Sequence, residues 1–395
     1  MKEQLRYVLK NYIWLVCIGI LLVMGISIYA INSIEGSNVS QLTRRISMAE
    51  NIREIVSVGY IRNGYLSAGL LSNSGQAGDV IILAKSDKLG KVEWEREYNL
   101  GGKAEFQNVY HMPDQSIFLV GSLMPAGGNL YNGIVYKFSP DGKMLWKKMF
   151  PHYFKNHISA IQPSGDGGFY CAGNTRVTGD GNQEAWIFKL DAQGDKNWEK
   201  VIGDRGIDES SNLITNSDGT FLMAGSRTDK DTGIWNAWLV KFNKQGDTLW
   251  EKTYFPGEIS ESYSLKSCPD GGYLVMGGCK SLRPGMRNLL VFKVDNEGQV
   301  VWKKKPQLPD FENLKAAYSS EDGSFLLACN SQNRILLLSM DLNGVIKGEK
   351  IISPWGINVL EGIQDYTRSN ATLLCKSSRF FSRNQIFSME IPISR

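Results

Sequence analysis

The sequence predicts an all-β protein built from repeated units, because two independent residue markers recur at a constant interval of 52 residues. The first marker is a tryptophan with a glycine four residues before it, and its copies are Trp94, Trp146, Trp198, Trp250 and Trp302. The second marker is an aspartate that opens a tight turn, and its copies are Asp114, Asp166, Asp218, Asp270 and Asp322. Two markers in register over five copies indicate a repeat protein in which one supersecondary unit is copied many times.

Each repeat contains four short segments with the character of β-strands. In the copy spanning 157–202 these segments are HISAIQP, FYCAG, AWIFKLD and NWEKVI, separated by two Asp/Gly turns and one longer polar loop. Such runs predict an antiparallel meander. The second segment is apolar on both faces, as expected for a strand buried between neighbouring sheets. Four strands per 52 residues, repeated around a ring, are typical of a β-propeller blade.

We count seven units, of which the last two depart from the pattern. The sixth unit keeps Asp341 and Gly344 but has Gly348 in place of the tryptophan, and the seventh ends before a fourth strand. We expect residues 39–47 to supply the missing strand as a clasp, because Leu42 lies one step before the first tryptophan. Closing the ring in this way would remove exposed sheet edges. The prediction is a seven-bladed β-propeller over residues 39–395.

The N-terminal region predicts a membrane anchor. Residues 12–31 carry no charge and are almost wholly apolar, which matches the roughly 20 residues that a helix needs to span a bilayer. Three basic residues precede this run: Lys2, Arg6 and Lys10. The positive-inside rule therefore places residues 1–11 in the cytoplasm and the propeller on the extracytoplasmic side, after a linker at 32–38. No clear cleavage site follows, so we expect an uncleaved, single-pass signal anchor in the cell membrane.

Charge and cysteine content exclude several classes of function. The formal net charge is only +4, and two sets of lysines or arginines keep the 52-residue step, which indicates solvated strand faces. Without a clustered basic groove we expect no nucleic-acid partner. The five cysteines beyond the apolar run lack metal-ligand spacing and are typical of small buried hydrophobes. We therefore expect no cofactor.

The phrase formed by Asp191, Gly194 and Trp198 resembles the tryptophan-docking repeat of pyrroloquinoline-quinone-type propellers. That family includes quinoprotein dehydrogenases and cofactor-free bacterial envelope propellers, such as the outer-membrane-assembly lipoprotein. The chain is also similar to secreted bacterial proteins with Asp-Gly-Gly-Tyr turns followed by Trp-Lys strands. The resemblance implies that the indoles pack between blades and have no catalytic role. This chain differs from the quinone enzymes in its blade count and in lacking a vicinal cysteine pair and an assignable calcium-ligand set.

The two ends of the predicted blades differ. Uniform Asp/Gly turns define what we call the turn face, whereas long variable loops define the loop face, at residues 122–133, 174–184, 226–236, 280–288 and 353–359. Variation on a rigid scaffold favours a binding role. Five aromatic residues in or near these loops are candidate contact anchors: Trp235, Trp355, Tyr131, Tyr153 and Phe154. The alternative is that they only cover the ends of the blades.

A second candidate site is a polar ring at the start of the innermost strands. Its members keep the 52-residue step: Glu105, His157, Glu209 and Glu261. Such a ring at the channel mouth could bind a cation such as calcium, or a basic partner. The alternative is that each side chain caps the backbone of its own blade.

Together these features predict a membrane-anchored, extracytoplasmic propeller that binds a protein partner or surface ligand as a non-catalytic scaffold. The alternatives are a quinone-dependent dehydrogenase or a carbohydrate-active enzyme that uses the channel, and a ligand sensor. No nucleophile elbow or phosphate-binding loop is present.

Overall fold

The computed structural model describes most of the region after residue 42 and none of the region before it. The described residues are 43–46, 52–61, 63–71, 78–151, 154–177, 182–203, 206–255, 260–280, 287–306, 313–319, 324–331, 334–352, 359–366, 370–377 and 385–392. Within these ranges no helix is long and apolar enough to cross a bilayer. The predicted anchor at 12–31 and its linker lie outside the described residues, so the membrane topology stays a prediction.

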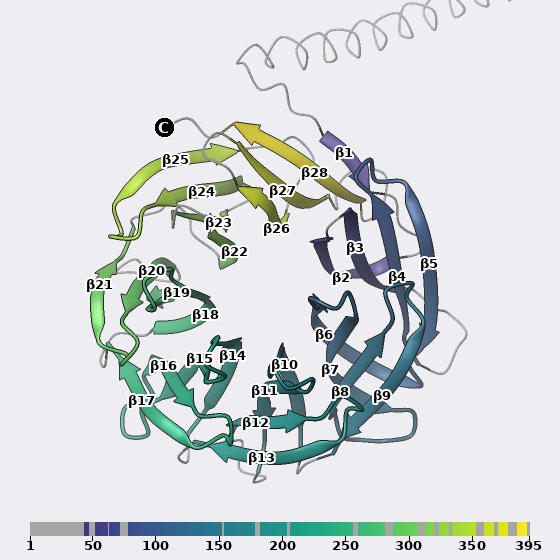
Figure 1. Ribbon diagram of the computed structural model, residues 1–395, viewed down its shortest axis with the longest axis horizontal. Coiled ribbons are helices and arrows are strands. Elements are labelled where there is room, and N and C mark those ends of the chain that lie inside the picture. The colour runs from purple at the N-terminus through teal and green to yellow at the C-terminus, as the bar shows by residue number, and fades with distance from the viewer. Residues whose placement is uncertain are drawn as a thin grey trace, which may run out of the picture. The chain divides into compact units, whose positions relative to one another are not determined.

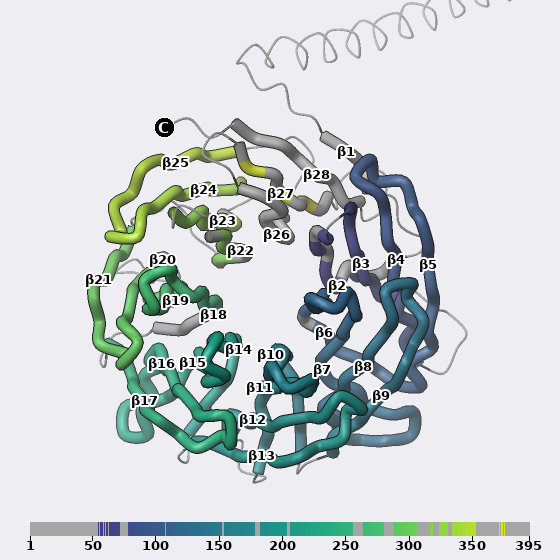
Figure 2. The backbone as a smooth tube through the Cα atoms, in the orientation of Figure 1, coloured from purple at the N-terminus to yellow at the C-terminus, as the bar shows by residue number. Residues whose placement is uncertain are grey.

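The described strands form an all-β propeller, in which four-stranded antiparallel sheets surround a central axis (Figure 1). Six of the sheets each contain four consecutive strands, from β2–β5 to β22–β25. A further four-stranded sheet joins β1 to β28, β27 and β26. The tube in Figure 2 shows successive sheets following one another around the ring in chain order.

The strands fall into four positions from the centre outwards. The innermost strands are β2 (Ile52–Ile61), β6 (Gly102–His111), β10 (Asn156–Pro163), β14 (Asp208–Thr215), β18 (Ser260–Ser267), β22 (Asn313–Ser319) and β26 (Val359–Tyr366). The second strands are β3 (Gly64–Leu71), β7 (Ile117–Pro125), β11 (Phe169–Thr175), β15 (Phe221–Thr228), β19 (Tyr273–Lys280), β23 (Phe325–Ser331) and β27 (Asn370–Ser377). The third strands are β4 (Val80–Asp87), β8 (Asn132–Phe138), β12 (Glu184–Leu190), β16 (Trp235–Phe242), β20 (Arg287–Val294), β24 (Arg334–Met340) and β28 (Gln385–Pro392). The outermost strands are β5 (Val92–Asn99), β9 (Met144–Phe150), β13 (Lys196–Ile202), β17 (Thr248–Tyr254), β21 (Val300–Lys304), β25 (Ile346–Ile352) and β1 (Thr43–Ile46).

Burial explains the difference between inner and outer strands. Every residue of β3 is buried, and Phe169–Gly173 of β11 are buried on both faces, because each sheet packs against two neighbours. The outermost strands β9 and β17 instead alternate between exposed and partly buried residues, with only the last residue of each fully buried. One face of each outer strand therefore meets solvent, as its alternating sequence requires.

The innermost strands share a second regular feature, a β-bulge. The pairing register shifts between Phe106 and Asn108 in β6, between Ile158 and Ala160 in β10, and at the equivalent place in β14. An extra residue on one strand bends it and increases its twist. Contacts between consecutive innermost strands continue around the axis, and β26 also contacts β2.

The periodic tryptophans hold neighbouring blades together. Each indole lies against the turn glycine of the following blade, so that a Cβ added at Gly142 would lie 2.6 Å from the Trp94 ring. The same contact joins Trp146 to Gly194, Trp198 to Gly246, Trp250 to Gly298 and Trp302 to Gly344. These glycines also have φ between 74° and 83°, a conformation that disfavours a side chain. Close approach and backbone conformation both require glycine there.

Polar contacts reinforce the same blade junctions. Tyr98 and Tyr254 donate hydrogen bonds from their hydroxyls to the carbonyls of Gly142 (2.6 Å) and Gly298 (2.9 Å). On the outer strands, Lys200 Nζ lies 2.8 Å from Asp247 Oδ1 in the turn of the next blade. Lys148 and Lys252 make equivalent contacts, with Asp195 and with the Glu297 carbonyl, so three outer-strand lysines each join a blade to the next.

The prediction that the periodic lysines are solvated is wrong for two of those on the third strands, whereas Lys85 and Lys137 are partly exposed. Lys241 and Lys293 are only 5% and 6% exposed. Lys189 and Lys293 form ion pairs with the turn aspartates of their own blades, Asp166 and Asp270. Lys241 donates to Asn296 Oδ1 at 2.5 Å. Burying an ammonium is costly without such partners, so the turn aspartates and these lysines recur together.

The prediction that the cysteines are small buried hydrophobes is confirmed, since all five described cysteines are buried.

Replacing Gly246 by alanine tests the docking contact. The added Cβ would lie 2.6 Å from the Trp198 ring, so we expect Gly246→Ala to lose more stability than Gly167→Ala, by about 1–3 kcal/mol from overpacking. Gly167 is the matched control because its φ is 88° and a Cβ there meets nothing within 4 Å. Chemical denaturation of both variants gives the comparison, and equal losses would show that backbone strain alone accounts for the glycine.

Candidate functional site

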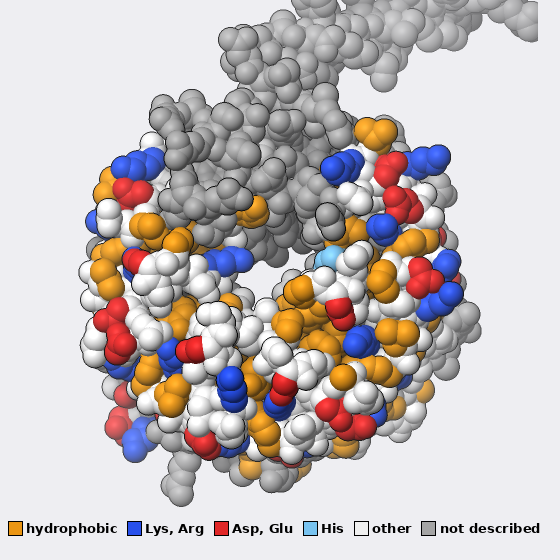
Figure 3. Space-filling view, viewed as in Figure 1, with side chains coloured by type: hydrophobic (Ala, Val, Ile, Leu, Met, Phe, Trp, Pro, Cys, Tyr) orange, Lys and Arg blue, Asp and Glu red, His pale blue; other side chains and the backbone are white. Residues whose placement is uncertain are grey.

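The propeller topology places chemically different segments on its two faces. The turn face holds the Asp-containing turns between first and second strands, where Asp166 and Asp218 accept hydrogen bonds from nearby Ser or Thr hydroxyls and backbone amides. These bonds hold the pKa of both aspartates below the usual range, to about 2 at Asp166, where the Lys189 ammonium is the main cause. The loop face carries the longer connections and the start of each innermost strand. No single basic patch is visible in Figure 3, where acidic and basic side chains mix around the ring.

Two predicted site residues, Glu105 and Tyr131, come together on the loop face between the second and third sheets. Lys155 connects them, since its Nζ lies 3.8 Å from Glu105 Oε2 and 5.2 Å from the centre of the Tyr131 ring. Burial and the Glu105 charge both raise the pKa of Tyr131. The neighbouring Phe154 is 49% exposed. We call Glu105, Tyr131, Phe154, Lys155 and His157 the loop-face cluster.

His157 is the least solvated titratable group of this cluster. It is the second residue of β10, and its Nδ1 lies 3.2 Å from the Ser122 hydroxyl of β7. Burial lowers the pKa of His157 to about 4, against an opposing effect of Glu105, and Lys155 lowers it further. Its Nε2 is buried and has no hydrogen-bond partner within the described part of the chain. His157 is therefore a neutral imidazole at physiological pH.

The described residues of the predicted polar ring contact different partners and do not meet at one site. Glu105 pairs with Lys155 of the next blade, whereas Glu209 Oε1 accepts a hydrogen bond of 2.8 Å from Gln183 Nε2 of the preceding one. Glu261 lies in β18, but its side chain is outside the described part. Among the described residues, no group of three or more His, Cys, Asp or Glu side chains could hold a metal ion. Calcium binding stays a prediction.

The other predicted aromatic anchors are distributed differently from the expectation. Trp235 is not a loop residue: it is the first residue of β16, paired with Thr228 of β15, and it is partly buried. This pairing extends the hairpin by one step and shortens the loop. Trp355 and Tyr153 lie outside the described residues.

Sequence reasoning missed Lys155 of the loop-face cluster and also Ser122, whose hydroxyl lies 3.2 Å from His157 Nδ1. Lys155 escapes notice because its 52-residue step holds lysine only at Lys103 and isoleucine in the next two units, and the serine looks like any polar residue at the end of a strand. Tyr131 lies in a loop of one blade, and Phe154 and Lys155 lie before the first strand of the next. Their proximity follows only from the placement of the two blades side by side.

Comparison with known proteins supports the fold and does not assign a family. No known family and no curated protein sequence matches the chain. Among solved structures, virginiamycin B lyase from Staphylococcus aureus superposes with a TM-score of 0.57 and 11% identity, covering 89% of this chain and 99% of that one. Polysaccharide lyase Uly1 gives 0.56 and 9%, covering 91% and 94%. Puromycin hydrolase gives 0.54 and 12%, covering 87% of this chain and 52% of that one.

These likenesses define a class, the β-propellers, and nothing narrower. The resemblance to the pyrroloquinoline-quinone-type repeat family is not confirmed, because no family matches. The similar proteins include two lyases and a hydrolase. At these identities they show the shared fold only.

The titration of His157 gives a testable pH dependence. Unfolded histidine takes up a proton near pH 6.5, whereas His157 in the folded protein resists protonation down to about pH 4. Stability therefore falls as the pH drops from about 6.5 to 4, because the unfolded state binds the extra proton. We expect His157→Gln to reduce this loss by about 1–3 kcal/mol.

Denaturation at pH 7.5, 6, 5 and 4.5 gives the measurement. His111→Gln is the reference variant: burial also lowers the pKa of His111, but this side chain is exposed, so we expect a smaller change in the pH profile than for His157→Gln. Parallel pH profiles for the wild type and His157→Gln would contradict the expectation.

Proposed function

We propose that this protein is a membrane-anchored, extracytoplasmic β-propeller that binds a protein partner through the loop-face cluster. The observation that carries the proposal is the placement of Tyr131, Phe154, Lys155 and Glu105 around one junction between blades. Exposed aromatic groups beside charged groups that can pair across an interface are typical of contact sites. Residues 12–31 would hold the propeller close to the membrane.

A site-specific photocross-linking experiment tests this role. A photoreactive residue placed at Phe154 in the full-length protein should form discrete adducts in intact cells, and Lys155→Glu should abolish them. The control position is Leu89, which is 71% exposed in a turn on the opposite face. Equal labelling at both positions, or adducts insensitive to Lys155→Glu, would contradict binding through the cluster.

We also propose that the ring has seven blades and that residues 39–47 complete the last one. The proposal is supported by the antiparallel pairing of β1 with β28, from Thr43 opposite Met389 to Ile46 opposite Ile386. It is further supported by the contact between β26 and β2. The two ends of the ring would then be joined by main-chain hydrogen bonds.

Deleting residues 39–47 should expose the edge of β28. An unpaired edge strand promotes association, so we expect oligomers and a melting temperature lower by roughly 5–10 °C. Light scattering and thermal unfolding of the protein in detergent give the measurement. Deleting residues 32–36 of the linker is the control, and an unchanged monomer without 39–47 would contradict the clasp.

A second candidate is an enzyme of the lyase type, favoured by the neutral His157 with its unpaired Nε2. Two lyases share the fold. A histidine with a pKa of about 4 is a weak base at neutral pH, which places this candidate second. Formation of unsaturated products from an acidic polysaccharide, lost in His157→Gln, would favour the enzyme.

A further inference from the structure

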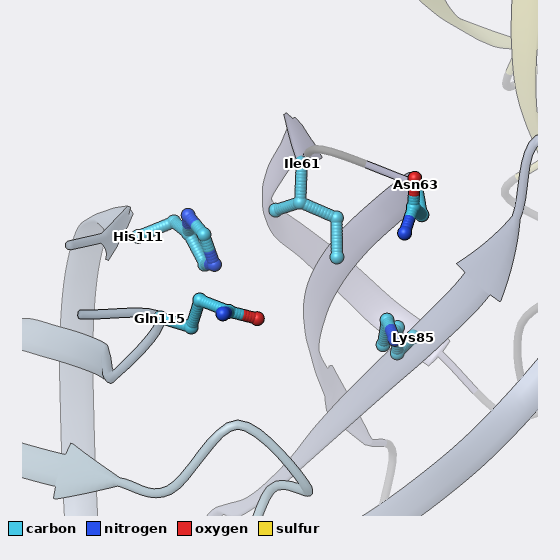
Figure 4. A pocket seen from close by; sticks show the side chains of 5 residues that line it. All are labelled: Ile61, Asn63, Lys85, His111 and Gln115. Carbon is cyan, nitrogen blue, oxygen red and sulfur yellow. The ribbon is translucent and has the colours of Figure 1, made fainter. Parts of the chain in front are cut away.

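The turn face contains a cavity lined by several residues that differ from those at the same step of other blades. It has a volume of about 340 Å³ and is lined by Ile61, Asn63, Lys85, His111 and Gln115. Figure 4 shows His111 and Gln115 on one side, opposite Ile61, Asn63 and Lys85 on the other. The lining residues come from the first and second sheets, at the opposite ends of the innermost strands from the loop-face cluster.

Two of the lining residues stand where other blades have the turn glycine. Asn63 and Gln115 keep the 52-residue step of Gly167, Gly219 and Gly271. Gln115 nevertheless adopts φ of 66°, the left-handed conformation that its glycine counterparts adopt without strain. A non-glycine residue there costs on the order of 1–2 kcal/mol. Strain of this kind concentrates at functional sites, and here it brings an amide side chain to the cavity.

Lys85 is the periodic lysine whose blade lacks the usual aspartate. In other blades the equivalent Lys189 and Lys293 pair with a turn aspartate, but Arg62 occupies that step in the first blade. Lys85 instead lies 2.7 Å from Glu93 Oε2 on β5, and 26% of its side chain is exposed. An ammonium has three donors, so Lys85 can bind a second acceptor in the cavity while it keeps Glu93.

The lining chemistry favours an anion. The cavity presents one ammonium, one imidazole, two carboxamides and one aliphatic side chain, and no carboxylate is among these five residues. Burial lowers the pKa of His111, Asp114 opposes this, and Lys85 lowers it further, so the neutral ring offers one N–H donor. The volume is at the lower end of the range for small-molecule sites, about 300–1,000 Å³.

We propose that this cavity binds a small organic anion of sugar size. Its carboxylate or phosphate oxygens accept hydrogen bonds from Lys85 and from the amide groups of Asn63 and Gln115. Ile61 contacts the less polar face of the ligand. The site is independent of the loop-face cluster, so the propeller can hold a small ligand on one face and a protein partner on the other.

Calorimetry on the full-length protein in detergent tests the site with three probes: glucuronate, glucose 6-phosphate and neutral glucose. We expect at least one anion to bind and glucose not to bind. Tighter binding of glucuronate assigns a carboxylate ligand, and tighter binding of glucose 6-phosphate assigns a phosphate ligand. A charge-assisted hydrogen bond contributes enough that Lys85→Met should weaken binding about 10-fold or more.

Lys137→Met is the matched control, because Lys137 is the same periodic lysine in the second blade and does not line the cavity. It should leave affinity unchanged. Gln115→Gly should weaken binding several-fold and raise the melting temperature, because it removes both an amide and the backbone strain. Absence of binding by both anions, equal binding of glucose, or equal weakening by Lys137→Met would overturn the proposal.

Discussion

The contact between an indole and a turn glycine is the interaction on which the rest of this structure depends. Each tryptophan on an outer strand lies against the glycine of the next blade, and the glycine has both the left-handed backbone and the open surface that the ring requires. The Trp198 ring could not approach as closely if any side chain were present at Gly246. Because the contact repeats at five successive junctions, the angle between these blades is set each time by the same pair of residue types. The ring-shaped arrangement follows from that repetition.

Repetition also explains how much of the fold could be predicted. Trp198 and Asp166 recur in register, and turn glycines separate short β-rich runs, so the four-stranded unit and its propeller arrangement follow from the sequence. The partner against which each tryptophan packs could not be predicted from the sequence. The glycine four residues before a tryptophan belongs to the same blade as that tryptophan, but it contacts the tryptophan of the previous blade. The burial of Lys241 was missed for a similar reason. Periodicity records that a residue recurs, and it does not record which side of the sheet carries its partner.

The candidate sites were harder to predict because they depend on single departures from the pattern. Glu105, Tyr131 and His157 follow from strand position and loop location, but the contact that unites the first two comes from Lys155, whose one lysine counterpart at the 52-residue step is Lys103. Sequence gives no sharp limit to a hairpin, so the prediction places Trp235 in a loop, whereas in the structure one more pair of residues extends the strand to include it. In a repeat fold, the residues that all blades share are explained by packing. Functional residues are therefore sought among those that differ between blades.

The docking contacts of the periodic tryptophans also have a direction, since each of these five indoles lies against the turn glycine of the next blade. The series ends at Trp302, because the sixth unit has Gly348 at the tryptophan step and the clasp segment has Leu42. Two of the junctions around the ring are thus built without an indole, and both adjoin the sheet that contains β1. At the junction with the β22–β25 sheet, aliphatic packing of Leu326, Leu337 and Leu373 takes the place of the indole.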